Sequence, residues 1–123
     1  PETGGYYVES TILENVHNNM RVAQEEIFGP VLVVTEFDTP EEAIRIANDT
    51  SYGLAAAVWT SDLSRAHRTA RALQAGFVWV NCFDVSDPTA PFGGFKQSGN
   101  GSRDKSLHAF DQYTQLKTTW IQL

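Results

Sequence analysis

The chain has 123 residues, a formal net charge of −6 and a pI near 4.9. This acidic balance argues against a nucleic-acid partner, because phosphate binding needs a basic patch. Hydrophobic residues make up 41% and charged residues 20%, as in ordinary folded domains. No apolar run approaches the roughly 20 residues of a membrane span, and no signal-peptide pattern is present. We therefore expect a cytoplasmic protein without a membrane partner.

Strands are predicted at three places in the middle of the chain. Residues 31–37 (VLVVTEF) form a nearly continuous apolar, β-branched run, as expected of a strand buried on both faces. Residues 55–60 and 77–80 have the same character. Helical stretches separate the three strands, so the order corresponds to two βαβ units. The sequence therefore predicts the α/β class, with one parallel βαβαβ sheet.

The two intervening helices have recognisable boundaries. The first begins with Thr39 as its N-cap, with a capping-box glutamate three residues later, and ends near Asn48. The second is capped by Ser61 or Asp62, and Gly76 is the predicted C-terminal stop.

Such a sheet needs apolar cover on both faces. Right-handed crossovers place both helices on one face, although the strands are apolar on both sides. Residues 1–30 and 82–123 read mostly as loop and would not cover the second face. We therefore expect the chain to be part of a larger protein. The start at Pro1 is by itself compatible either with removal of an initiator Met or with a start inside a longer chain.

The single cysteine, Cys82, has two interpretations. It excludes an intrachain disulfide and argues against a cysteine-built metal centre, so no metal site is predicted. It follows the strand at 77–80, and ligands of parallel sheets bind beyond such strand ends. An activated thiol needs a nearby histidine, cation or helix N-terminus, and none is adjacent in sequence. The residues favour a packing or pocket-wall role, with a small thiol enzyme as the alternative.

Two other segments stand out. Residues 25–30 (EEIFGP) place two carboxylates beside an aromatic residue and a Gly-Pro turn. They form either a solvated turn or a site that binds sugar hydroxyls and stacks on a heteroaromatic ring. Residues 91–101 are rich in glycine, which permits close backbone approach, but they lack the spacing of a phosphate-binding loop.

Taken in order, five segments resemble the aldehyde dehydrogenase superfamily. They are residues 5–12 (GYYVESTI), 24–31 (QEEIFGPV), 48–56 (NDTSYGLAA), 75–81 (AGFVWVN) and 91–99 (PFGGFKQSG). The resemblance covers essentially the whole chain. It implies that residues 1–110 correspond to the C-terminal part of a catalytic domain. Residues 111–123 would then be the strand of an oligomerisation arm, through which a homo-oligomer forms.

The resemblance also implies a reaction. Members of the family oxidise an aldehyde to its carboxylic acid with NAD or NADP, through a thiohemiacetal, hydride transfer and thioester hydrolysis. The family's nucleophilic cysteine and general-base glutamate lie upstream of the matched segments. The chain is therefore expected to contain no catalytic residue, and Cys82 is not the nucleophile by this alignment. We expect the isolated chain to be inactive and to bind no cofactor alone.

Binding residues carry over by position. Glu26 matches the glutamate that binds the nicotinamide ribose hydroxyls, and Phe28 matches the aromatic residue near the nicotinamide ring. Four residues fall where the family builds the wall and mouth of its aldehyde pocket: Cys82, Phe83, Asp84 and Phe92.

The substrate is suggested by the tail. Residues 98–110 are similar to bacterial enzymes that oxidise γ-glutamyl-γ-aminobutyraldehyde and related aminoaldehydes in polyamine breakdown, if Ser102 is treated as an extra residue. Asp84 would suit an amine-bearing substrate, or it is a solvated loop residue. A second interpretation of the whole chain is an assembly module that associates through its exposed sheet.

Overall fold

The computed structural model describes residues 4–123 of the chain. The chain has two compact units, which divide between Thr50 and Ser51. Each unit contains a small parallel sheet and at least one helix, so the predicted α/β class with parallel strands is confirmed. The predicted boundary between residues 110 and 111 separates a catalytic part from an arm, and it stays a prediction.

The first unit is built on strands β1 (Thr11–Leu13) and β2 (Val31–Val33). They pair in parallel, with Thr11 opposite Val31 and Leu13 opposite Val33. The short helix α1 (Arg21–Gln24) lies between them in sequence, and α2 (Pro40–Asn48) follows β2.

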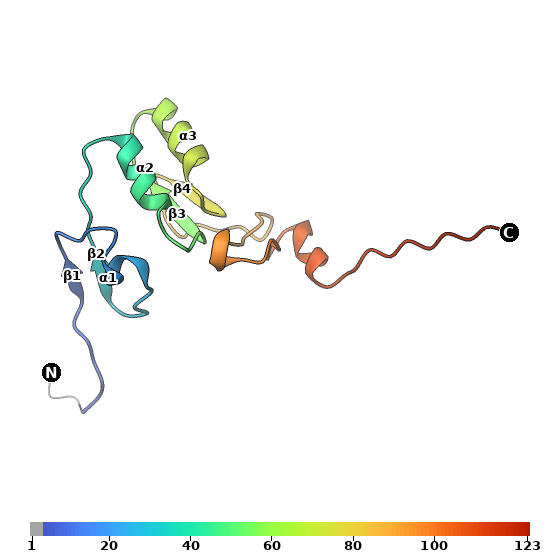
Figure 1. Cartoon of the computed structure of the whole chain (residues 1–123), viewed down its shortest axis with the longest axis horizontal. Coiled ribbons are helices and arrows are strands. Elements are labelled where there is room, and N and C mark those ends of the chain that lie inside the picture. The colour runs from blue at the N-terminus through green and yellow to red at the C-terminus, as the bar shows by residue number, and fades with distance from the viewer. Residues whose placement is uncertain (1–3) are drawn as a thin grey trace. The chain divides into compact units, whose positions relative to one another are not determined.

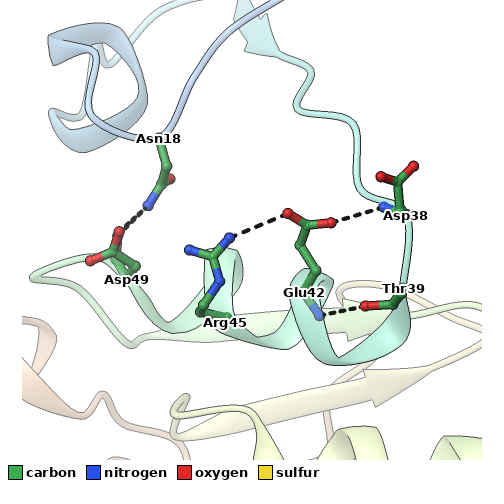
Figure 2. A network of polar contacts seen from close by, with 6 residues as sticks. All are labelled: Asn18, Asp38, Thr39, Glu42, Arg45 and Asp49. Carbon is green, nitrogen blue, oxygen red and sulfur yellow. Dashed lines mark hydrogen bonds and ion pairs between the residues drawn. The ribbon is translucent and has the colours of Figure 1, made fainter.

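Helix α2 begins and ends where the sequence predicts. The Thr39 hydroxyl accepts a hydrogen bond from the Glu42 backbone N–H at 3.2 Å, so the N-cap is confirmed. The Glu42 carboxylate accepts from the backbone N–H of Asp38 at 3.0 Å, one residue before the cap (Figure 2). The same carboxylate forms an ion pair with Arg45 at 3.3 Å. Three separate contacts therefore fix the first turns of α2.

A second network joins the ends of α1 and α2. The Asn18 amide donates to the Asp49 carboxylate at 2.7 Å (Figure 2). The Gln24 amide donates to the backbone carbonyls of Asn18 and Asp49, at 2.7 and 2.9 Å. Since Gln24 is the last residue of α1, these bonds anchor the start of the segment that carries the two adjacent glutamates.

The second unit is a βαβ arrangement. Strands β3 (Ala55–Val58) and β4 (Phe77–Val80) pair in parallel, and helix α3 (Leu63–Ala72) packs on both. Figure 1 shows α3 running beside this sheet. Two 3-10 helices follow, η1 (Lys96–Ser98) and η2 (Leu107–Gln112).

The sequence correctly predicts where α3 begins but not where it ends. The Asp62 carboxylate accepts a hydrogen bond from the Arg65 backbone N–H at 2.9 Å, which confirms Asp62 as the N-cap. The helix ends at Ala72, so the predicted stop at Gly76 is wrong. Leu73 takes an extended backbone conformation and ends the helix without a left-handed glycine.

The predicted single βαβαβ sheet is also wrong. In the described residues β2 pairs with β1, and β3 pairs with β4, so two two-stranded sheets replace one of three strands. The apolar pattern of residues 31–37 indicates a strand but does not specify its neighbour. The β-branched residues of β1 provide that neighbour within the first unit.

The C-terminal segment differs from the predicted strand. Residues 114–123 form neither helix nor strand in this chain. The backbone groups of a strand need a partner strand, and none of the described residues pairs with this segment. The arm strand therefore stays a prediction for an assembly.

Within residues 4–123, no helix has the length and apolar character required to cross a bilayer.

Candidate functional site

The first part of the candidate site follows α1. Glu25 forms an ion pair with Arg21 at 2.7 Å, one helical turn earlier. Glu26 is exposed, and no hydrogen bond or ion pair joins its side chain to the described part of the chain. A cavity of about 320 Å³ lies here, lined by Arg21, Val22, Glu25, Glu26 and Ile27. Of the two adjacent glutamates, Glu26 thus has the carboxylate available to a ligand.

Phe28 has an unusual backbone. Its φ of 55° lies in the left-handed region, and its side chain is 93% exposed. A bulky residue in this conformation is strained, and such strain concentrates at binding sites. The chain therefore holds an aromatic face in solvent, two residues after the carboxylate of Glu26.

The second part of the candidate site is a loop after β4. Cys82 is half-buried, whereas Phe83 and Asp84 are exposed. Two residues of the loop, Asn81 and Asp84, have left-handed backbones, with φ of 55° and 57°. These two turns fold the chain back at the carboxyl end of β4, where ligands of parallel sheets bind.

Hydrogen bonds hold both ends of the loop, one just beyond the sheet and one on β4. At its start, the Asn81 amide donates to the Thr60 carbonyl at 3.0 Å and accepts from the Thr60 N–H at 2.8 Å. At its end, the Trp79 indole N–H donates to the Val85 carbonyl at 2.7 Å.

An aromatic row connects the two aromatic pocket residues predicted from the sequence. Phe83 contacts Trp79 with ring centroids 5.1 Å apart, and Trp79 contacts Phe77 at 4.5 Å. Phe77 contacts Phe92 at 5.9 Å. Phe77 and Trp79 are two residues apart on β4 and so lie on one face of the sheet. The second unit therefore brings Phe83 and Phe92 onto a shared apolar surface.

Phe92 has further support from the chain that follows it. It forms an antiparallel bridge with Asp104, with backbone bonds of 2.7 and 2.6 Å. The Lys105 ammonium lies 5.6 Å from the centre of the Phe92 ring.

The glycine-rich segment serves close packing within the chain. A Cβ atom on Gly76 would meet the Gly93 carbonyl at 1.7 Å, so the two backbones touch. The Phe95 and Gly76 N–H groups both donate to the Gly53 carbonyl, at 2.8 and 3.0 Å. Gly93, Gly94 and Gly99 pack against backbone, which gives this segment a structural function.

Sequence reasoning missed two residues of this site. The sequence places Trp79 in a buried strand and in a family motif but predicts no contact with the loop, which its indole holds. Asn81 was assigned only to a family motif, although it joins the ends of β3 and β4. The signal for Trp79 was the aromatic pair at positions 77 and 79, since a buried indole needs a partner for its N–H.

The described residues contain no set of three or more His, Cys, Asp or Glu side chains that could hold a metal ion. In the same part of the chain, no hydrogen bond joins Cys82 to a histidine.

The Aldehyde dehydrogenase family model matches residues 1–119 of this chain, which include the Glu26–Phe28 segment, the loop after β4 and the glycine-rich segment. The chain therefore belongs to the aldehyde dehydrogenase family.

Individual relatives agree with this assignment. The NADP/NAD-dependent aldehyde dehydrogenase PuuC of Escherichia coli K12 is 61% identical over 113 residues, which are 92% of this chain and 23% of PuuC. Aminoacetaldehyde dehydrogenase of Pseudomonas aeruginosa is 55% identical over 95% of this chain and 24% of its own length.

Solved structures give the same result. A mutant of the P. syringae indole-3-acetaldehyde dehydrogenase AldA, in complex with NAD+ and IAA, is 74% identical with a TM-score of 0.91. The match covers 99% of this chain and 24% of the AldA chain. This chain thus spans about a quarter of the length of the relatives it matches.

Proposed function

We propose that this chain contributes one part of an NAD(P)-dependent aldehyde dehydrogenase, which oxidises an aldehyde to its carboxylic acid. The observation that carries the proposal is the family match over residues 1–119. Within the matched residues, the side chains of Glu26 and Phe28 are exposed and accessible to a ligand. The structures of relatives with bound NAD+ support the same cofactor class.

Glu26 and Phe28 are the proposed cofactor residues. An ionised carboxylate accepts hydrogen bonds from ribose hydroxyls, and the Glu26 carboxylate is exposed at the cavity after α1. An exposed aromatic ring offers an apolar face to a nicotinamide ring, as Phe28 does. The cofactor, when bound, supplies the hydride acceptor, and these two residues orient its nicotinamide end.

The aldehyde pocket is proposed to include Cys82, Phe83, Asp84 and Phe92. The two phenylalanines belong to the aromatic row on β4 and provide apolar contact surface. Asp84 is exposed beside Phe83 and would attract a substrate ammonium group. The similarity to an aminoacetaldehyde dehydrogenase supports an aminoaldehyde as the substrate class.

The isolated chain is proposed to lack turnover. The covalent step needs an activated nucleophile and a general base, which in this family lie upstream of the matched segments. In the described residues Cys82 has no histidine partner that would activate it.

The test is aldehyde-dependent NAD(P)H production by the purified chain, with an aminoaldehyde and an aliphatic aldehyde of similar length. We expect no production from the chain alone, and production from the complete enzyme that contains it. In the complete enzyme, Cys82→Ser should keep turnover, with any change confined to the KM for aldehyde. Turnover by the isolated chain that disappears on alkylation of Cys82 would instead establish the small thiol enzyme.

We also propose a homo-oligomer that forms through residues 111–123. Tyr113, Leu116, Trp120, Ile121 and Leu123 are all largely exposed in this chain. Exposed apolar side chains beside unpaired backbone groups favour strand addition to another sheet.

A further inference from the structure

We propose that Trp79 is a positioning residue for the loop from Cys82 to Val85, and that it acts on aldehyde binding through this loop. The inference rests on the proposed function, because the loop carries three of the proposed pocket residues. Trp79 itself would not touch the substrate.

The first support is the hydrogen bond between Trp79 and Val85. Trp79 is 7% exposed, one of three buried hydrophobic side chains among the described residues. Its indole N–H donates to the Val85 carbonyl at 2.7 Å, across six residues of chain. A buried N–H without a partner is costly, so this bond favours the loop position in which the Val85 carbonyl is within reach.

The second support is the position of the bond relative to the pocket residues. Asn81 fixes the start of the loop through its two bonds to Thr60. Trp79 fixes the end, one residue after Asp84. Because Trp79 lies on β4 and the Asn81–Thr60 bonds lie just past the ends of β4 and β3, the residues between the two anchors are held at the carboxyl end of β4.

The third support is the aromatic contact. The Trp79 ring lies 5.1 Å from the Phe83 ring, between centroids, and 4.5 Å from the Phe77 ring. The indole therefore orients a pocket side chain by its ring and the loop backbone by its N–H. Phe77, on the same face of β4, contacts the Trp79 ring. Its side chain has no hydrogen-bond donor, so it cannot hold the loop backbone as Trp79 does.

The test compares Trp79→Phe with Trp59→Phe in the complete enzyme. Trp79→Phe keeps an aromatic ring and removes the donor. Trp59 is 64% exposed and follows β3, so the same substitution there is the matched control. Two quantities are measured at saturating NAD+: the KM for aldehyde, and the alkylation rate of Cys82, followed by mass-spectrometric mapping of its peptide.

For Trp79→Phe we expect both the KM for aldehyde and the alkylation rate of Cys82 to rise about fivefold, as for loss of one buried hydrogen bond. The KM for NAD+, measured separately at saturating aldehyde, and all values for Trp59→Phe should stay within about twofold of the parent enzyme. An unchanged alkylation rate would overturn the inference. A raised alkylation rate with an unchanged aldehyde KM would also overturn it, because the loop would then not act on the substrate.

A second variant covers the case in which Trp79→Phe does not fold. Phe83→Leu removes the ring contact at an exposed position, and it should raise the alkylation rate of Cys82 in the same direction. An unchanged rate in this variant would count against the inference. The alkylation rate of Cys82 can be measured without turnover. If the complete enzyme oxidised no aldehyde, the proposed function would be contradicted. The alkylation rate would still test whether Trp79 holds the loop.

Discussion

Phe28 combines an exposed aromatic ring with a left-handed backbone. Either feature alone would be unfavourable for stability, because apolar surface stays in water and the backbone is strained. A ligand that packs on the ring would account for both. Glu26, two residues earlier, adds the carboxylate that a ribose needs.

Substitution of Phe28 should separate strain from binding. Phe28→Gly and Phe28→Ala both remove the ring, so both should raise the KM for NAD+ of the complete enzyme. Glycine tolerates the left-handed backbone, whereas alanine does not. We expect the glycine variant to be more stable than the alanine variant by about 1 kcal/mol in urea unfolding. An alanine variant at least as stable as the glycine variant would show that the backbone strain is absent.

The helix caps act at the scale of elements. The pKa of Asp62 is lowered from its ordinary value of 3.8, chiefly because the Arg65 backbone N–H donates to its carboxylate. In the loop after β4, the pKa of Asp87 is lowered too, mainly by the hydrogen bond from the Thr89 hydroxyl, although Asp87 caps no helix. A lowered carboxyl pKa stabilises the folded chain above the unfolded value and loses that effect as the pH falls through the folded value.

The N-cap of α3 therefore has a predictable acid response. Asp62→Asn keeps an acceptor for the Arg65 N–H and removes the titration. As the pH falls below 3.8, the free energy of unfolding of the complete enzyme should decrease more steeply for the parent protein than for this variant. Chemical unfolding at a series of pH values measures the difference. Parallel curves for the two proteins would mean that the Asp62 cap makes no ionic contribution.

Local signals predicted some elements well. Thr39, Glu42 and Asn48 lie within ten residues of one another, and they correctly predicted both ends of α2. The stop of α3 was missed because Gly76 suits a helix end by type, although its actual role is contact with the Gly93 backbone. That contact joins segments far apart in sequence, so a local sequence pattern cannot predict it.

Pairing and site geometry were harder to predict for the same reason. The apolar run of β2 is compatible with either sheet, and only the folded chain shows that β1 is its neighbour. The assignment of Phe83, Asp84 and Phe92 to an aldehyde pocket rests on family motifs, whereas Cys82 also stands out by residue chemistry as the single cysteine after a predicted strand. The row of rings that joins Phe83 to Phe92 depends on β4 alternation and on the loop that folds back.

Much apolar surface is exposed across the whole molecule. The described residues include only three buried hydrophobic side chains, Val16, Ala66 and Trp79. A chain of this size needs a larger core to be stable alone. Contacts with further protein surface, within an enzyme subunit or between subunits, would bury these side chains.

The C-terminal segment should contribute to assembly. Deletion of residues 114–123 removes Leu116, Trp120, Ile121 and Leu123, all exposed in this chain. In the complete enzyme we expect a smaller assembly by sedimentation velocity, because the deletion removes the segment proposed to pair between subunits. A substitution of Leu107→Ser outside the segment serves as a control for general loss of apolar surface. An assembly of unchanged size after the deletion would contradict the proposed arm.

The most direct measurement is the KM for NAD+ of the complete enzyme with Glu26→Gln, compared with Glu36→Gln. Both substitutions remove one exposed glutamate charge from the same unit, but only Glu26 lies at the proposed ribose site. Loss of a charged acceptor should raise the KM for NAD+ about tenfold in Glu26→Gln. Glu36→Gln should leave it unchanged. Equal values for the two variants would contradict the assignment of Glu26 to the cofactor and, with it, the central claim.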